Sequence, residues 1–227
     1  FDGTDDHLTG SSTFSSLDGE VNASFSIWVK PISGGSTLRM VFQIGRGGGV
    51  NTLDSQCQLF LYEGNRIDFS ITQGGNYGRG FINNLTYGAW NHIVVAIDLS
   101  HGSTPECQFF VNGVDKTNND NLASIGAFPT ATDELYVGKS KTNKYNPFNG
   151  NIDEFAIWPG TTLTLSQAQA IYNSGVPTNL ASFSPAPSHW WRNGDGDTYP
   201  NITDNIGSYN LSMVNMASGD IETDVPT

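Results

Sequence analysis

The sequence predicts an all-β fold, a two-sheet antiparallel jelly-roll β-sandwich with one short peripheral helix. Three observations predict it. Apolar residues recur at every second position in many short runs, turn-forming dipeptides separate these runs, and a single stretch has the spacing and caps of a helix. The 227 residues are enough for one large β domain with its own core, and the 26 glycines suit tight turns between strands.

The expected strands follow one another along most of the chain. Side chains of a strand point alternately to its two faces, so apolar residues at every second position predict a strand with one buried face. The clearest sets are Phe25, Ile27 and Val29; Ile67, Phe69 and Ile71; and Ile93, Val95, Ile97 and Leu99. Further strands are expected at 40–44, 58–62, 108–111, 136–140 and 148–158, with hairpin turns at 64–65 and 112–113.

One helix is expected at about 164–174. Thr164 and Gln167 have the spacing of a capping box, in which each side chain bonds the other residue's backbone N–H. Gly175 is placed to end the helix, and Pro177 prevents it from restarting. One apolar face is formed by Leu165, Ala168, Ile171 and Tyr172.

The chain is expected to divide into three parts. Residues 1–180 form the jelly roll, and the proline-containing segment 181–189 is expected to be a linker. Residues 190–227 contain strand-forming residues and begin with Trp190 and Trp191, so we expect a C-terminal hairpin extension that completes the same sandwich.

Composition excludes some partners. Ten basic and 22 acidic residues give a net charge of −12, which argues against nucleic acid, because phosphate binding requires Lys and Arg. No apolar run approaches the roughly 20 residues that span a bilayer. The chain starts at Phe1 in a strand-like run without an initiator Met, so we expect a processed chain or a part of a longer one.

Two cysteines, Cys57 and Cys107, each begin a strand-like run. A disulfide between them and a pair of free thiols both remain open, because the sequence does not give the Cα separation that a disulfide requires.

Four segments, in this order, resemble the laminin-G-like jelly rolls of the concanavalin A-like lectin/glucanase superfamily. They are residues 1–6, residues 24–31, residues 90–95 with 110–113, and residues 148–158 with the helix that follows. Residues 190–215 are similar to the segment that often precedes the opening strand in this family. Here this segment comes last, so either the fold is permuted or a second repeat is cut short.

The superfamily includes glucanases, but the sequence predicts that this protein is not an enzyme. Retaining glycoside hydrolysis needs two carboxylates about 5 Å apart. The family's enzymes carry them as Glu-x-Asp-x-x-Glu, which does not occur here, and strand alternation places Asp153 and Glu154 on opposite faces. No Ser-His-Asp set or zinc spacing is apparent, and the run at 45–49 lacks the Lys-Ser/Thr of a phosphate loop.

The resemblance also implies a structural calcium ion (Ca2+) between the opening acidic turn and the closing unit. The matching residues are Asp2, Asp5, Asp6 and Asp153. Carboxylate oxygens from separate segments suit the 6–8 ligands of calcium, although a solvated turn would look the same. A second set, Asn193, Asp195, Asp197 and Asp204, has calcium-loop spacing. It lacks the loop's glycine and glutamate, which favours a polar hairpin tip.

Two loops pair aromatic rings with amides, as carbohydrate recognition requires. The candidate glycan-binding residues are Asn76, Tyr77, Arg79, Tyr145 and Asn146. The sequence therefore predicts a non-catalytic module that binds a glycan or cell-surface polymer, on an extracellular or virion surface protein. The alternative is a structural or decoration module of a phage particle or surface appendage, which contacts other protein chains of that assembly.

Overall fold

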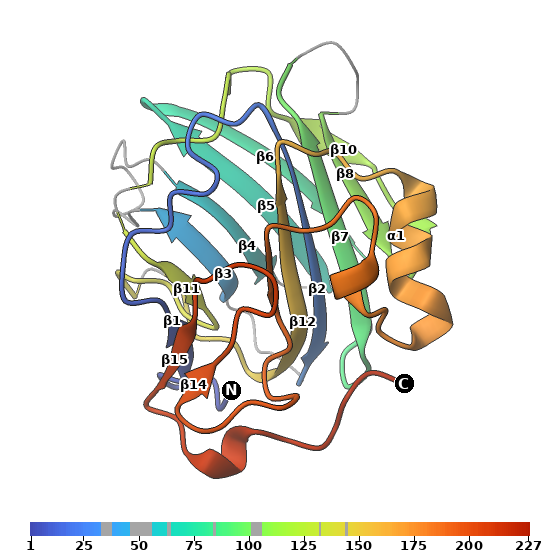
Figure 1. The fold of residues 1–227 in the computed structure, drawn as a ribbon. Helices are drawn as coiled ribbons and strands as arrows, with labels where there is room; N and C mark the ends of the chain where they lie inside the picture. The colour runs from blue at the N-terminus through green and yellow to red at the C-terminus, as the bar shows by residue number, and fades with distance from the viewer. Residues whose placement is uncertain are drawn as a thin grey trace.

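In the computed structural model, two antiparallel β-sheets pack face to face and a short helix lies beside the smaller sheet, as Figure 1 shows. This arrangement confirms the predicted fold class. The structure describes residues 1–32, 38–45, 56–62, 65–83, 85–100, 106–131, 133–143 and 145–227. The glycine-rich run at 45–49 and the turn at 64–65 lie partly outside the described residues.

Within the described residues, the large sheet has nine strands in the order β10, β6, β5, β4, β3, β11, β1, β15 and β14. Their bounds, in that order, are Asn119–Asn121, Asn76–Ile82, Arg66–Gln73, Gln56–Tyr62, Arg39–Gly45, Leu135–Val137, His7–Thr9, Leu211–Val214 and Asn201–Ile202. This sheet carries the candidate binding face described below.

The small sheet has six strands among the described residues, in the order β13, β12, β2, β7, β8 and β9. Their bounds are His189–Trp191, Gly150–Pro159, Asn22–Pro31, Asn91–Asp98, Cys107–Val111 and Val114–Asp115. Each run that was expected as a strand contains one. The turn between β8 and β9 has Asn112 and Gly113 at positive φ, as its sequence predicts.

The main core lies between the sheets and is rich in phenylalanine. Phe25 of β2 lies 5.1 Å from Phe42 and 5.3 Å from Phe69, measured between ring centroids. Phe42 also stacks on Phe155 of β12 at 4.9 Å. All four side chains are fully buried, so aromatic contacts between the two sheets fix their separation.

Both cysteines are free and buried, which settles the alternative left open by the sequence. Cys57 belongs to the large sheet and Cys107 to the small one. Burial raises the pKa of the Cys57 thiol, so this residue packs as a small apolar side chain.

The helix α1 runs over Leu165–Tyr172 and has the predicted capping box. The Gln167 N–H donates to Thr164 Oγ1, and the Thr164 N–H donates to Gln167 Oε1. The α-helical residues end before the expected position 174, because Asn173 adopts a left-handed conformation and a short 3₁₀ turn follows. No helix among the described residues is long and apolar enough to cross a membrane.

The C-terminal segment adds β13 to the small sheet and β14 and β15 to the large sheet. In the small sheet, Trp191 of β13 pairs with Phe155 of β12. In the large sheet, Met213 of β15 pairs with Leu8 of β1, so the two ends of the chain lie side by side. Figure 1 shows both termini at the same end of the sandwich.

Residues 181–189, expected as a linker, pack against the small sheet. The Trp158 indole N–H donates to the Pro185 carbonyl, and the Ser188 N–H donates to the Ile157 carbonyl. His189 is already part of β13. The segment therefore holds the tail in register with β12.

Trp191 is the strongest test of how much the tail stabilises the fold. Its side chain is fully buried in the main core, so Trp191→Ala should lower the free energy of unfolding by about 3–5 kcal/mol. Tyr199 is an aromatic residue of the same tail with 43% of its surface exposed, and Tyr199→Ala is the control. Urea unfolding of both variants gives the comparison. Equal midpoints for the two would show that the tail does not contribute to the core.

His92 of β7 should make stability depend on pH. Its ring is fully buried between Trp28 and Tyr172, and burial lowers its pKa from 6.5 to about 3. The unfolded chain therefore binds a proton below pH 6.5 that the folded chain does not bind. Stability should fall as pH decreases from 6.5 towards 3, by about 1.4 kcal/mol per unit from this group. The slope of unfolding free energy against pH should be smaller in His92→Gln, and an unchanged slope would contradict this assignment.

Candidate functional site

A row of polar side chains crosses the outer face of the large sheet. Tyr136 of β11 is directly opposite Gln43 of β3, and Gln43 is opposite Gln58 of β4. Gln58 is in turn opposite Ser70 of β5, and Ser70 is opposite Arg79 of β6. Directly opposite residues of antiparallel strands lie on the same face. We call these five residues the polar row.

The polar row points away from the main core because the neighbouring positions point into it. Leu59, Phe69 and Ile71 belong to the core and alternate with residues of the row. A hydrophobic strand face thus leaves its polar neighbours on the other side of the sheet, where Gln43, Gln58 and Ser70 are buried and Arg79 is more accessible.

Hydrogen bonds hold the row in a fixed arrangement. Gln43 Nε2 donates to Gln56 Oε1 at 2.8 Å, and Gln58 Nε2 donates to Ser70 Oγ at 3.1 Å. Only 1% of the surface of Gln43, Gln58 or Ser70 is exposed. The amides are therefore positioned before any ligand arrives.

Tyr145 lies over this face. Its ring stacks on Phe60 of β4 with centroids 5.0 Å apart and planes 10° from parallel. Its hydroxyl accepts from Gln58 Nε2 at 3.4 Å, and its N–H donates to Ser140 Oγ at 3.3 Å. These contacts bring the loop that follows β11 onto the polar row.

Arg79 is the more accessible of two arginines at the β6 end of the row. Buried Asp68 accepts two hydrogen bonds from Arg66, at 2.6 and 2.9 Å. Burial raises the Asp68 pKa, and the hydrogen bonds from Arg66 oppose that effect. The Arg79 guanidinium is 3.7 Å from the same carboxylate, and 38% of its side-chain surface is exposed. Arg66 therefore satisfies Asp68, and Arg79 retains donors for another group.

The structure brings together three of the five candidate glycan-binding residues. Tyr77, Arg79 and Tyr145 all lie on or beside the polar row, and 54% of the Tyr77 surface is exposed. Asn76 and Asn146 are exposed at the rim. Sequence reasoning missed the interior of this face, Gln43, Gln58, Asp68 and Ser70, although their polar positions in alternating strands contained the signal.

The acidic turn at the N-terminus is compact. Carboxylate oxygens of Asp2, Asp5 and Asp6 lie within 4.8 Å of one another. The Asp2 N–H donates to Asp6 Oδ2 at 2.9 Å, and Asn215 Nδ2 donates to Asp5 Oδ2 at 2.9 Å. Burial raises the pKa of Asp6, whereas the hydrogen bond from the Thr4 N–H lowers that of Asp2. Three oxygen donors this close fit a hard divalent cation.

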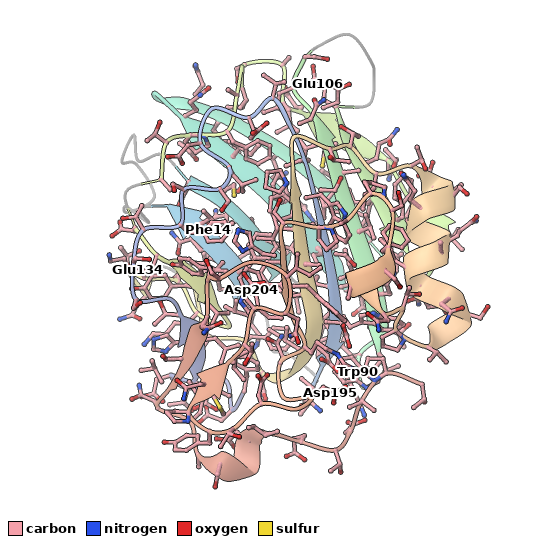
Figure 2. All side chains as sticks on the ribbon, viewed as in Figure 1. Phe14, Trp90, Glu106, Glu134, Asp195 and Asp204 are labelled. Atoms are coloured by element: carbon pink, nitrogen blue, oxygen red, sulfur yellow. The ribbon has the colours of Figure 1, made fainter. Side chains whose placement is uncertain are left out.

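Asp153 does not join the other three acids in that group of described residues. It lines a cavity beneath the C-terminal tail together with Asp195 and Arg192. Burial, followed by the charge of Glu154, raises the Asp153 pKa to about 8. Asp195 and Trp90 mark this end of the sandwich in Figure 2.

A β-bulge changes how the acidic pair of β12 is presented. The register with β2 shifts between Asp153 and Ala156, and Glu154 adopts a positive φ of 50°. The strict alternation that would place the two acids on opposite faces therefore does not hold here. Glu154 instead accepts hydrogen bonds from Trp190 Nε1 at 2.6 Å and Arg192 Nε at 3.2 Å.

The carboxylates of the hairpin tip at 193–204 accept hydrogen bonds from nearby groups of the same segment. Asp197 accepts from the N–H groups of Gly194 and Thr203, and Asp195 pairs with Arg192. These contacts agree with a polar hairpin tip.

The structure also contains a hydrogen-bonded set of a serine, a histidine and an aspartate. Ser16 Oγ lies 2.7 Å from His189 Nε2, and His189 Nδ1 lies 2.6 Å from Asp204 Oδ2. The residues are far apart in the sequence and show no motif, so only the fold reveals them.

A family model described as the concanavalin A-like lectin/glucanases superfamily matches residues 2–169. No curated protein matches the sequence.

Solved structures with the same fold include several proteins of low sequence identity. The heptameric SAP-like pentraxin from Limulus polyphemus has a TM-score of 0.58 at 12% identity, over 95% of this chain and 90% of that one. The CBM40 of the Ruminococcus gnavus IT-sialidase, bound to α2,3-sialyllactose, has a TM-score of 0.53 at 15% identity, over 72% and 92%. A leech intramolecular trans-sialidase gives 0.52 at 15% identity, over 77% of this chain and 28% of its own.

Proposed function

The chain belongs to the concanavalin A-like lectin/glucanases superfamily, and we propose that it is a module that binds glycans on the outer face of its large sheet. The observation that carries the proposal is that the accessible Tyr77 and Arg79 lie at one end of the polar row, on which Tyr145 also packs. Sugar rings present hydroxyl groups around their edges and C–H groups on their faces. The guanidinium of Arg79 suits the hydroxyl edges, and the exposed ring of Tyr77 suits the faces.

The size of the face suits an extended ligand. Neighbouring strands lie about 4.8 Å apart, so the four steps from Tyr136 to Arg79 span about 19 Å. Gln58 and Ser70 are buried and hold each other, so they give the accessible residues beside them a fixed support. A structural neighbour, the Ruminococcus gnavus CBM40, is described as bound to sialyllactose, which supports glycan as the ligand class.

We propose binding of the glycan without cleavage of its glycosidic bonds. Cleavage requires two carboxylates that flank the bond. Among the described residues, Asp68 lies on β5 and is held by Arg66, whereas Glu134 lies beside Tyr136 at the β11 end of the row. These two carboxylates are three strand spacings apart, about 14 Å, which is too far to flank one glycosidic bond. An extracellular or virion surface is the setting that we propose for such a module.

We further propose a structural calcium ion at the acidic turn. Asp2, Asp5 and Asp6 would hold it, with Asn215 of the tail next to Asp5. Since β1 follows this turn and pairs with β15, a cation there would fasten the opening strand to the tail. Asp153 lies beside Glu154, Asp195 and Arg192, and the proposed ion does not require it.

The glycan proposal predicts loss of binding in two variants. Tyr77→Ala and Arg79→Gln should each weaken a bound glycan by about tenfold or more, because each loss of about 1.4 kcal/mol is a factor of ten. Tyr199→Ala, which removes an exposed tyrosine of the tail, is the control. A glycan array identifies the ligand, and calorimetry measures the variants. If no glycan binds, or if both variants bind as the wild type does, the role as a structural or decoration module would be favoured.

The calcium proposal predicts a change in melting temperature. A ligand that binds only the folded state stabilises it by about 2.7 kcal/mol at 100 times its Kd, so calcium should raise the melting temperature and a chelator should lower it. Asp5→Asn should remove the response, whereas Asp115→Asn, at an exposed aspartate of β9, should keep it. Identical melting curves in calcium and in chelator would show that the acidic turn is only solvated.

A further inference from the structure

Three residues from distant parts of the chain form a continuous set of hydrogen bonds. Ser16 lies in the loop before β2, His189 begins β13, and Asp204 follows β14. The two contacts, 2.7 Å from Ser16 Oγ to His189 Nε2 and 2.6 Å from His189 Nδ1 to Asp204 Oδ2, have the order and lengths of a nucleophile, base and orienting carboxylate.

Hydrogen bonds from the backbone favour the ionised form of the Asp204 carboxylate. Besides His189 Nδ1, it accepts hydrogen bonds from four backbone N–H groups, those of Trp190, Ile206, Gly207 and Tyr209. Burial alone would raise the Asp204 pKa, but the hydrogen bonds from His189 and the backbone lower it on balance. All of its backbone partners are donors, so the carboxylate remains an acceptor towards the ring.

The tautomer of His189 follows from this. Because Asp204 accepts a proton from Nδ1, the lone pair of the neutral ring is on Nε2. Ser16 Oγ must then donate its proton to Nε2. This polarity is the one in which a histidine activates a serine as a nucleophile.

The surroundings hold the ring in place. His189 stacks on Trp191 with planes 4° apart and contacts Phe14 at 5.0 Å, and only 9% of its surface is exposed. A Cβ atom at Gly207 would come within 2.4 Å of Asp204 Oδ2 and 2.7 Å of His189 Nδ1. Only glycine fits so close an approach. Figure 2 labels Asp204 of this set and Phe14, which contacts the His189 ring.

The turn that carries Ser16 supplies two further donors. The Asp18 N–H donates to the Ser15 carbonyl at 3.1 Å, which makes Ser16 and Leu17 the central residues of a turn. Their own N–H groups donate to no acceptor among the described residues. The N–H of a nucleophile and that of the residue after it are placed to stabilise an oxyanion formed at the nucleophile.

We propose that Ser16 is a nucleophile that cleaves small acyl esters, with His189 as its base and Asp204 as a positioning residue. The neighbouring loop residues, Ser11, Ser12, Thr13 and Ser15, are exposed and polar. They offer no apolar pocket for a long acyl chain, so the substrate class is a short-chain O-acyl ester of a polar alcohol such as a sugar. This proposal does not depend on glycan binding at the polar row.

The chemistry is balanced without a cofactor. Ser16 Oγ attacks the ester carbonyl carbon while its proton passes to His189 Nε2. The bond between the acyl carbon and the alcohol oxygen breaks, and His189 returns the proton to the leaving alcohol. Water then hydrolyses the acyl-serine with His189 again as base, which releases the carboxylic acid and restores Ser16.

The test uses the whole chain and a fluorophosphonate probe. Mass spectrometry should find one adduct, on Ser16, and the protein should hydrolyse 4-nitrophenyl acetate. Ser16→Ala should abolish the adduct and lower the hydrolysis rate about 100-fold or more. Ser15→Ala, at the exposed neighbour, is the control and should change neither.

A second variant tests the base without removing His189 or Asp204. Ser16→Cys should be alkylated by iodoacetamide faster than a free thiol at pH 6, because His189 would draw off its proton. The native thiols are buried and do not compete. Absence of a Ser16 adduct in the folded wild type, together with ordinary reactivity of Ser16→Cys, would overturn the proposal. The three residues would then only fasten the 10–21 loop to the tail.

Discussion

The buried Asp204 carboxylate is the contact on which the closure of the sandwich depends. It accepts hydrogen bonds from backbone N–H groups on both sides of the β14 hairpin, from Trp190 of β13 and from Tyr209 just before β15. These two strands belong to different sheets. One carboxylate therefore determines where the chain leaves the small sheet and where it enters the large one. Replacing the carboxylate by an apolar group would leave these backbone donors unsatisfied, which is costly in a buried turn.

The bulge in β12 is the second constraint, because it decides which groups face the tail. Two residues of β12 oppose one of β2 at this point, and Glu154 accepts a left-handed backbone conformation there. Glu154 then reaches Trp190 and Arg192, while Asp153 faces the cavity beneath the tail with a raised pKa. Pairing with the tail thus gives Glu154 hydrogen-bond partners and leaves Asp153 buried. Neither acid is left in the arrangement that glycoside hydrolysis requires.

Most of the fold followed from local sequence signals, but much of the site did not. Alternation and turn residues located the strands, and the capping box at Thr164 located the helix, because both depend on near neighbours in sequence. The bulge at Glu154 and the set of Ser16, His189 and Asp204 depend on strands 15 or more residues apart, whose register no local pattern specifies. Tyr77 and Arg79 were selected as candidates by residue type, whereas Gln58 was not, because its burial beside them depends on the pairing of the strands.

Different interactions organise the two ends of the large sheet, so the polar row and the contacts of the C-terminal tail are structurally separate. The polar row lies on β11, β3, β4, β5 and β6, whose register is set by their own hairpins and by the phenylalanine core. The acidic turn and Ser16 instead contact the tail, through Asn215 and His189. Distant and independent parts of a structure respond additively to change. Changes in the tail, including the ion binding and ester chemistry proposed for it, therefore need not disturb the spacing of the polar row, and changes on the polar row need not loosen the tail.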